Sequence, residues 1–211
     1  FQNMGGGLVK TFVQPIVNTG VELLNGTVSS FQTLVGLEPP SRALNEQEIA
    51  ELRSVYGDTV DYSQIRIKEG HLGIANGLAP HTIGNTIYIP QRDGQQRTVA
   101  ERNNLLVHEA AHVWQYQNGG TDYISESLYH QAMGAIGSGD RGEAYEFENA
   151  IRNGTTWADL NPEQQGHLID EAYNRGLFSN PNATFLAADG TDITTQVRAA
   201  INEMRNGRGA A

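Results

Sequence analysis

The apolar residues in the second half of the chain recur every three or four positions, which is the period of an α-helix. The clearest example runs from Thr98 to Gln117, where no Pro or Gly interrupts the pattern. Helices are also predicted over residues 125–133, 143–151, 162–175 and 192–205. The sequence therefore predicts a lobe built mainly of helices after residue 98.

The preceding residues predict one helix and two short strands. Asn45 and Glu48 have the spacing of an N-terminal capping pair, and the helix that they begin is expected to run through Tyr56. Residues 65–68 and 86–90 alternate apolar with polar residues or are rich in β-branched ones, which is typical of strands. The fold class expected from these patterns is α+β, mostly helical, with a small sheet packed beside the helical lobe.

Residues 1–40 differ from the rest of the chain. They contain three consecutive glycines at 5–7 and further interruptions such as Pro15 and Gly20. We interpret them as an N-terminal linker or packing segment that precedes one domain over residues 41–211. Because the chain starts at Phe1 and shows neither a signal-peptide pattern nor a bilayer-length apolar run, it resembles a domain excised from a larger protein.

The composition argues against a nucleic-acid binder and excludes a cysteine-ligated metal site. The net charge is −10, and the 14 basic residues are dispersed along the chain. Neutralising a phosphate backbone requires clustered Lys and Arg, so nucleic acid is not an expected partner. The chain has no cysteine. Any metal site must therefore be built from histidines and carboxylates.

The strongest chemical signal lies inside the long predicted helix, where His108, Glu109 and His112 form a His-Glu-x-x-His motif. Residues i and i+4 share one helix face, so both imidazoles can reach a single zinc ion. Glu109 lies about 100° around the helix from His108 and can act on a water molecule instead of binding the metal. The motif predicts one Zn²⁺ per chain with Glu109 as the general base.

A catalytic zinc ion needs a third protein ligand, and Glu163 is the favoured candidate. Pro162 places Glu163 in the first turn of a helix, and Gly166 removes side-chain bulk from the same face, so that this helix can approach the motif closely. The reserve ligands are acidic residues of an earlier predicted helix, with His167 behind them. These acidic residues are Glu143, Glu146 and Glu148.

Three further residues are candidates for supporting roles. Asp170 lies two turns along from Glu163 and could orient a ligand imidazole from outside the coordination sphere. Tyr145 and Tyr173 could donate a hydrogen bond to the oxyanion that forms during hydrolysis. The residues alone do not rank the two tyrosines.

The chain resembles the zincin-like metallopeptidase domains found at the C-termini of type VI secretion spike proteins (VgrG-type) and of Rhs polymorphic toxins. The resemblance spans most of residues 43–173 and rests on segments 56–62, 84–90, 106–117 and 161–165. This chain has Ala110-Ala111 where members of the family often have Leu-Thr or Met-Thr, and Gly166 where they have Ala. The resemblance implies a zincin fold of the gluzincin type and a role as an antibacterial effector.

We therefore expect a zinc metallopeptidase toxin domain that hydrolyses peptide amide bonds in peptide or protein substrates. A bacterial secretion system would deliver it into a target cell, with the periplasm as the expected compartment. Its expected partners are the parent spike or Rhs polypeptide and a cognate immunity protein. Segment 86–89 could bind an extended peptide by edge pairing. Two alternatives stay open: an amidase that cuts the peptide stems of peptidoglycan, and a non-catalytic delivery or interaction domain with a structural zinc that His167 could complete.

Overall fold

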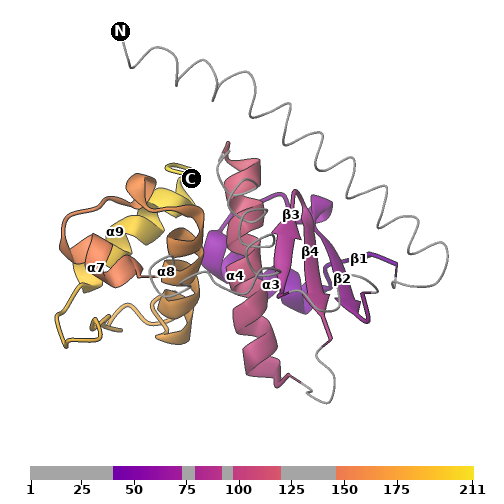
Figure 1. Ribbon diagram of the computed structural model, residues 1–211, viewed down its shortest axis with the longest axis horizontal. Coiled ribbons are helices and arrows are strands. Elements are labelled where there is room, and N and C mark those ends of the chain that lie inside the picture. Colours follow the sequence, from indigo (N-terminus) through magenta and orange to yellow (C-terminus); the bar gives the residue numbers. More distant parts are fainter. Residues whose placement is uncertain (1–39, 73–78, 92–96, 120–145) are drawn as a thin grey trace, which may run out of the picture.

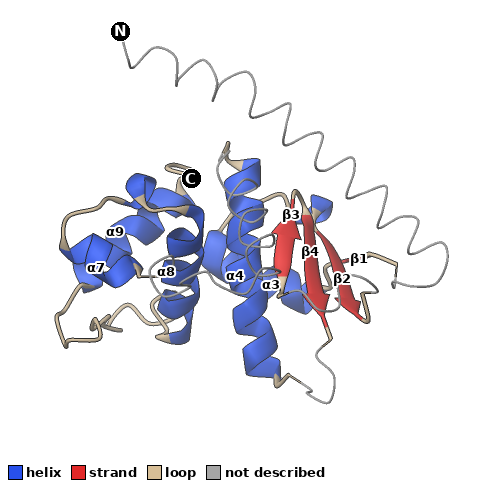
Figure 2. Ribbon diagram, in the orientation of Figure 1, coloured by secondary structure: helices blue, strands red, loops and turns tan. Residues whose placement is uncertain are grey.

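The computed structural model describes residues 40–72, 79–91, 97–119 and 146–211. A long helix, α4 (Val99–Gln117), lies between a four-stranded sheet and a group of helices (Figure 1). The sheet contains β1 (Arg42–Ala43), β2 (Arg66–Gly70), β3 (His81–Ile83) and β4 (Thr86–Pro90). The helices beyond α4 are α7 (Phe147–Arg152), α8 (Pro162–Asn174) and α9 (Thr194–Arg205). Figure 2 shows strands on one side of α4 only.

The sheet has the order β1-β2-β4-β3, with β2 and β4 parallel and both outer pairs antiparallel. β3 and β4 form a hairpin in which Ile83 pairs with Thr86, so that only Gly84 and Asn85 make the turn. Gly84 has a φ of 58°, a conformation that glycine adopts without strain. Because β4 is paired on both sides, the expectation that residues 86–89 form a free edge was wrong. The edge strand beside α4 is β3.

The first helix of the described region, α3 (Glu46–Tyr56), begins as its sequence predicts. The Asn45 side chain accepts a hydrogen bond from the Glu48 backbone, and the Glu48 side chain accepts one from the Asn45 backbone. At the other end Gly57 has a φ of 63° and its N–H bonds the Arg53 carbonyl. A short 3-10 helix, η1 (Tyr62–Gln64), then leads into β2.

The helix α4 is buried on nearly all sides along its second half. From Leu106 to Gln115 every residue except His108 is buried. A helix that is covered all around must lie inside the domain, between other elements. Its apolar side chains pack against the sheet and α8. Among its buried polar residues, Glu109 contacts β3, whereas His112 and Gln115 face α8.

Other boundaries differ from those expected. The helix predicted from residue 143 begins at Phe147, with Glu146 as its N-cap, and the helix predicted from residue 192 begins at Thr194. The helix predicted over 125–133, and residues 1–39 of the predicted linker, lie outside the described residues. None of the helices in the described part of the chain has the length and apolar character that a bilayer crossing requires.

Candidate metal centre

Two neighbouring helices bring the three favoured ligands together. His108 and His112 come from α4, Glu163 comes from the first turn of α8, and their ligand atoms all lie within 4.8 Å of one another. The Glu163 carboxylate lies between the two rings, with Oε2 at 3.4 Å from His108 Nε2 and Oε1 at 3.7 Å from His112 Nε2. The two Nε2 atoms and the carboxylate therefore face a common point.

Gly166 makes the close approach of the two helices possible. A Cβ atom at this position would lie 3.0 Å from Cε1 of His108 and 3.3 Å from both ring nitrogens. Such distances are shorter than ordinary van der Waals contact, so a side chain here would push against the imidazole. The absence of a side chain at residue 166 thus lets α8 carry Glu163 up to the histidines.

The Nδ1 atom of each histidine has its own partner. His108 Nδ1 lies 2.9 Å from Asp170 Oδ2 on α8, and His112 Nδ1 lies 2.8 Å from Gln115 Oε1 on α4. A histidine whose Nδ1–H is donated to an acceptor presents the lone pair of Nε2 to a metal. Asp170, expected as a supporting carboxylate, occupies that position for His108. Gln115 was not anticipated.

The charges around the site favour a cation. Burial opposes protonation of His108, but its hydrogen bonds to Asp170 and Glu163 outweigh this effect and raise the pKa of His108 well above its ordinary value. Burial alone would raise the pKa of Asp170, but bonds from His108 and His167 lower it. With Glu109 also buried, three carboxylates surround two imidazoles. Buried charges need compensation, which a divalent cation would provide.

Glu109 is oriented by the edge strand of the sheet. Thr82 Oγ1 of β3 lies 2.9 Å from Glu109 Oε2 and 3.0 Å from the Glu109 carbonyl oxygen. The carboxyl group is buried and is not one of the three clustered ligands. Its position fits a group that exchanges protons beside a metal without binding it. Thr82, which sequence reasoning missed, lies 27 residues before Glu109.

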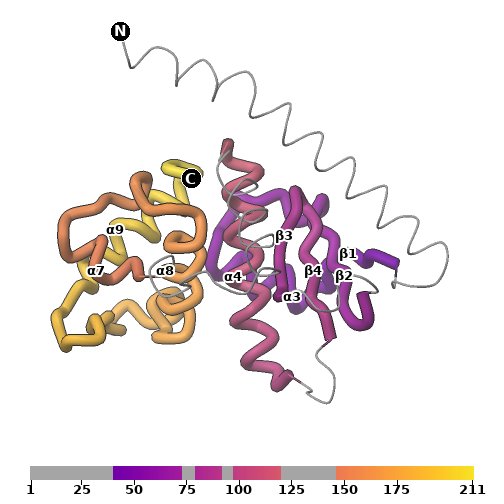
Figure 3. The backbone as a smooth tube through the Cα atoms, in the orientation of Figure 1, coloured from indigo at the N-terminus to yellow at the C-terminus, as the bar shows by residue number. Residues whose placement is uncertain are grey.

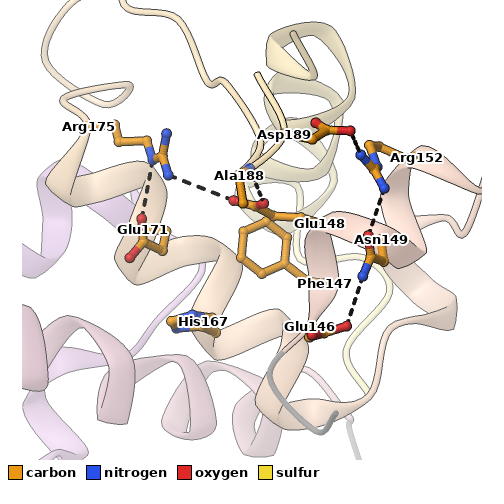
Figure 4. A pocket seen from close by; sticks show the side chains of 10 residues that line it. All are labelled: Glu146, Phe147, Glu148, Asn149, Arg152, His167, Glu171, Arg175, Ala188 and Asp189. Atoms are coloured by element: carbon orange, nitrogen blue, oxygen red, sulfur yellow. Dashed lines mark hydrogen bonds and ion pairs between the residues drawn. The ribbon is translucent and has the colours of Figure 1, made fainter. Parts of the chain in front are cut away.

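The other candidates lie away from this centre. Glu146, Glu148 and His167 line a separate pocket of about 350 Å³, in which Glu146 accepts a hydrogen bond from Asn149 (Figure 4). His167 Nδ1 lies 3.2 Å from Asp170 Oδ1, so this ring contacts the carboxylate oxygen of Asp170 that His108 does not.

Of the two tyrosines proposed as oxyanion donors, Tyr173 lies in the described part of the chain, and its hydroxyl is engaged elsewhere. The Tyr173 hydroxyl donates to Glu51 on α3, and burial together with this bond raises the pKa of Tyr173 to about 12. Tyr145 and the reserve ligand Glu143 lie outside the described residues. Among the described residues, the donor set of His108, His112 and Glu163 fits zinc, because two imidazoles and one carboxylate are a common ligand set of catalytic zinc sites.

Comparison with known proteins supports the predicted resemblance to a type VI secretion effector domain. No protein-family model matches the chain. Over 143 residues it is 31% identical to the type VI secretion system spike protein VgrG2b of Pseudomonas aeruginosa. This match covers 63% of this chain and 13% of VgrG2b. The chain thus corresponds to a small part of that relative. Among solved structures, the effector domain of Pseudomonas aeruginosa VgrG2b has the same fold, with a TM-score of 0.51 at 24% identity, over 87% of this chain and 96% of that domain.

Proposed function

We propose that this chain is a zinc-dependent peptidase domain that a type VI secretion system delivers into a target bacterium. The observation that carries the proposal is the meeting of His108, His112 and Glu163 with Glu109 buried beside them. Three protein ligands of these types leave one coordination position for water, as a catalytic zinc site requires. The fold would then be zincin-like and of the gluzincin type, as the sequence resemblance implies.

The reaction divides between the metal and Glu109. A zinc ion held by His108, His112 and Glu163 would supply a Lewis acid that lowers the pKa of a water molecule and polarises a substrate carbonyl. Glu109 supplies the base: its Oε2 accepts a hydrogen bond from Thr82, which leaves Oε1 to take a proton from water. The same carboxyl group then gives this proton to the leaving amine. Thr82 holds the carboxyl group in place during both transfers.

The sheet supports a peptide as the substrate. β3 lies at the edge of the sheet, and its central residue, Thr82, contacts Glu109. An extended peptide that pairs with β3 would pass directly beside the reactive carboxyl group. Such pairing uses the peptide backbone and provides affinity with little sequence selectivity.

A purely structural zinc site would be closed by a fourth protein ligand. His167 was the residue expected to supply it. His167 instead contacts Asp170, and its ring packs against Phe147 with ring centroids 5.7 Å apart. This arrangement favours the catalytic proposal over the structural one.

The likeness to VgrG2b and to its effector domain supports delivery by a type VI secretion apparatus. On this proposal the parent polypeptide is a secretion spike protein or a relative of it. A producing cell would need an immunity protein that blocks the domain. The target compartment that we propose is the periplasm.

Glu109→Gln tests the mechanism. Purified parent and variant should each contain about one zinc per chain and have the same circular dichroism spectrum, but only the parent should degrade denatured protein and harm a host that exports it to the periplasm. Glu101→Gln, an exposed change in the first turn of the same helix, is the matched control and should keep full activity. A folded, zinc-loaded Glu109→Gln protein that still hydrolyses substrate would refute the mechanism. Release of peptide stems from purified cell wall, without cleavage of protein, would identify an amidase.

A further inference from the structure

Two glutamine side chains fill the seam between α4 and α8 and are completely buried. Gln115 and Gln165 each have 0% of their surface exposed. Gln115 Nε2 donates to the Pro162 carbonyl and to Gln165 Oε1, both at 3.0 Å, while Gln115 Oε1 faces His112 Nδ1 at 2.8 Å. Gln115 therefore contacts the proposed metal ligand His112 directly. It also bonds the backbone immediately before a second proposed ligand, Glu163.

The second glutamine connects this pair to the segment 208–211. Gln165 Nε2 donates to the Trp157 carbonyl at 2.9 Å and to the Gly209 carbonyl at 2.7 Å. Its Oε1 also lies 3.3 Å from the backbone nitrogen of Ala211. Trp157 Nε1 in turn donates to the Arg208 carbonyl. The yellow end of the chain thus returns to the beginning of α8 (Figure 3).

The backbone carbonyls of Trp157 and Gly209, at one end of this series of amides, determine the direction of every hydrogen bond in it. A backbone carbonyl can only accept, so the NH₂ group of Gln165 must face Trp157 and Gly209. Its Oε1 must then face Gln115, whose own NH₂ group is needed there and at the Pro162 carbonyl. The oxygen of Gln115 is left facing His112. Because an amide oxygen can only accept, His112 must carry a proton on Nδ1.

We propose that Gln115 and Gln165 form an amide relay that fixes His112 as the Nδ1-protonated tautomer and so presents its Nε2 to the metal. The segment 208–211 anchors the relay, and through it acts on a metal ligand that it does not touch. Gln115 and Gln165 are positioning residues. The proposal rests on the proposed role of His112 as a zinc ligand.

The relay differs in kind from the support of the other histidine. His108 is held by the carboxylate of Asp170, which changes charge when it takes a proton. An amide neither gains nor loses a proton in the physiological range, so His112 keeps one tautomer without any change in local charge. If the glutamines served only to fill space, methyl thioether side chains of similar size would replace them with no effect on the imidazole.

The tautomer can be measured directly on the zinc-free protein. Long-range ¹⁵N–¹H correlation spectra of the imidazoles at alkaline pH show which nitrogen carries the proton. We expect the proton on Nδ1 of His112 in the parent, and a mixture of tautomers in Gln115→Met. A neutral His112 protonated on Nε2 in the parent would overturn the proposal. This experiment does not depend on zinc, so its outcome is separate from that of the proposed function.

Zinc affinity provides the second readout, measured by competition with a chelator. Gln115→Met should weaken zinc binding by about 10-fold to 100-fold, as the loss of a partner outside the coordination sphere usually does. Gln165→Met should weaken it by about threefold to tenfold and should also mix the His112 tautomers, although Gln165 does not touch the ring. The expected loss is smaller because one carbonyl, that of Pro162, still orients Gln115.

Two glutamines outside the relay serve as matched controls. Gln117 on α4 bonds Asp61 and Asn85, and Gln164 on α8 caps the helix through Asn161. Gln117→Met and Gln164→Met should leave the His112 tautomer unchanged and the zinc affinity within about twofold of the parent. If Gln165→Met behaves like these controls in both measurements, the relay does not exist. If no variant and no parent binds zinc while His112 stays protonated on Nδ1, the relay stands and the proposed function fails.

Discussion

The hydroxyl group of Thr82 bridges two oxygens of one residue, the carbonyl and the carboxylate of Glu109. It can donate its single proton to either oxygen, and its own oxygen can accept a proton from the carboxyl group. Thr82 can therefore remain hydrogen-bonded to Glu109 in both protonation states. A general base that later acts as an acid needs a partner of this kind.

Replacing Thr82 with Val removes the hydroxyl group but keeps the shape and the strand preference of the residue. Thr82→Val should lower kcat for peptide hydrolysis by about 10-fold to 100-fold, because the carboxyl group loses the contact that orients it. Zinc content should not change. Steady-state kinetics on the two proteins measure the effect, and Thr82→Ser, which retains the hydroxyl, should recover most of the activity. Equal kcat in Thr82→Val and the parent would contradict this role.

The assignment of the third ligand is tested by removing one carboxylate at a time. Glu163→Ala should lower zinc affinity by at least about 100-fold, because two histidines alone hold zinc weakly. Glu146→Ala is the matched control, since this acid lines the separate pocket, and its zinc affinity should stay within about twofold of the parent. Chelator competition on the variants side by side gives the answer. Zinc retained by Glu163→Ala and lost by Glu146→Ala would place the site elsewhere.

The close contact at residue 166 predicts a graded effect of side-chain size. Gly166→Ala brings a methyl group to 3.0 Å from the His108 ring, so the ring or its helix must shift by a few tenths of an ångström. Zinc affinity should fall by about tenfold. The zinc-free protein should keep its stability, because Ala is favoured over Gly in a helix by about 1 kcal/mol, which offsets the cost of the close contact. Gly166→Val should lose zinc almost completely. Metal titration and thermal unfolding of the zinc-free proteins separate these effects, and unchanged zinc affinity in both variants would contradict them.

The free energy of unfolding should decrease in acid because Glu48 becomes protonated. Glu48 lies on α3 and forms ion pairs with residues of β1 and α4. Its carboxylate bonds Arg42 before α3 and Arg102 on α4, at 2.8 and 2.6 Å. Burial raises the pKa of Glu48, but these bonds and the one from the Asn45 backbone outweigh it and lower the pKa to about 2. The folded pKa is below the unfolded value of 4.5. The unfolded chain therefore binds more protons, and the contribution is present above pH 4.5 and is lost as the pH falls toward 2.

Glu48→Gln should thus lower the free energy of unfolding at pH 7 by about 3 kcal/mol at most, and the difference from the parent should shrink steadily between pH 5 and pH 2. Urea denaturation at several pH values measures it. Glu101→Gln is the control, because Glu101 has the same capping position on α4 but lies exposed. If the difference in the free energy of unfolding between Glu48→Gln and the parent does not change with pH, protonation of Glu48 is not the cause of the loss of stability in acid.

The helices could be predicted because their signals are local. Asn45 with Glu48, and the uninterrupted run after Thr98, specify where α3 and α4 begin through bonds between residues three apart. The strands β1 and β3 have only two and three residues, too few for an alternating pattern to be visible. The Gly84-Asn85 pair between two β-rich segments was the available signal for the hairpin, since such pairs favour two-residue turns.

The site was predictable where helix geometry determines it. The spacing of His108 and His112 places both on one face, and Gly166 indicated which helix could come close enough to add Glu163. Gln115 follows His112 by three residues, so the same spacing could have identified it. Thr82 and the segment 208–211 reach the site only through tertiary contacts. No pattern in a single sequence predicts such contacts.

The juxtaposition of His112 and Glu163 also has a consequence for the unfolded chain. A metal ion held by both residues would be a crosslink in a protein that has no cysteine. It would close a loop of about fifty residues, and the loop-closure relation for such a link gives about 4 kcal/mol of stabilisation. The ion would then tie α4 to α8, so its loss would loosen the contact between the two helices and its gain would strengthen it.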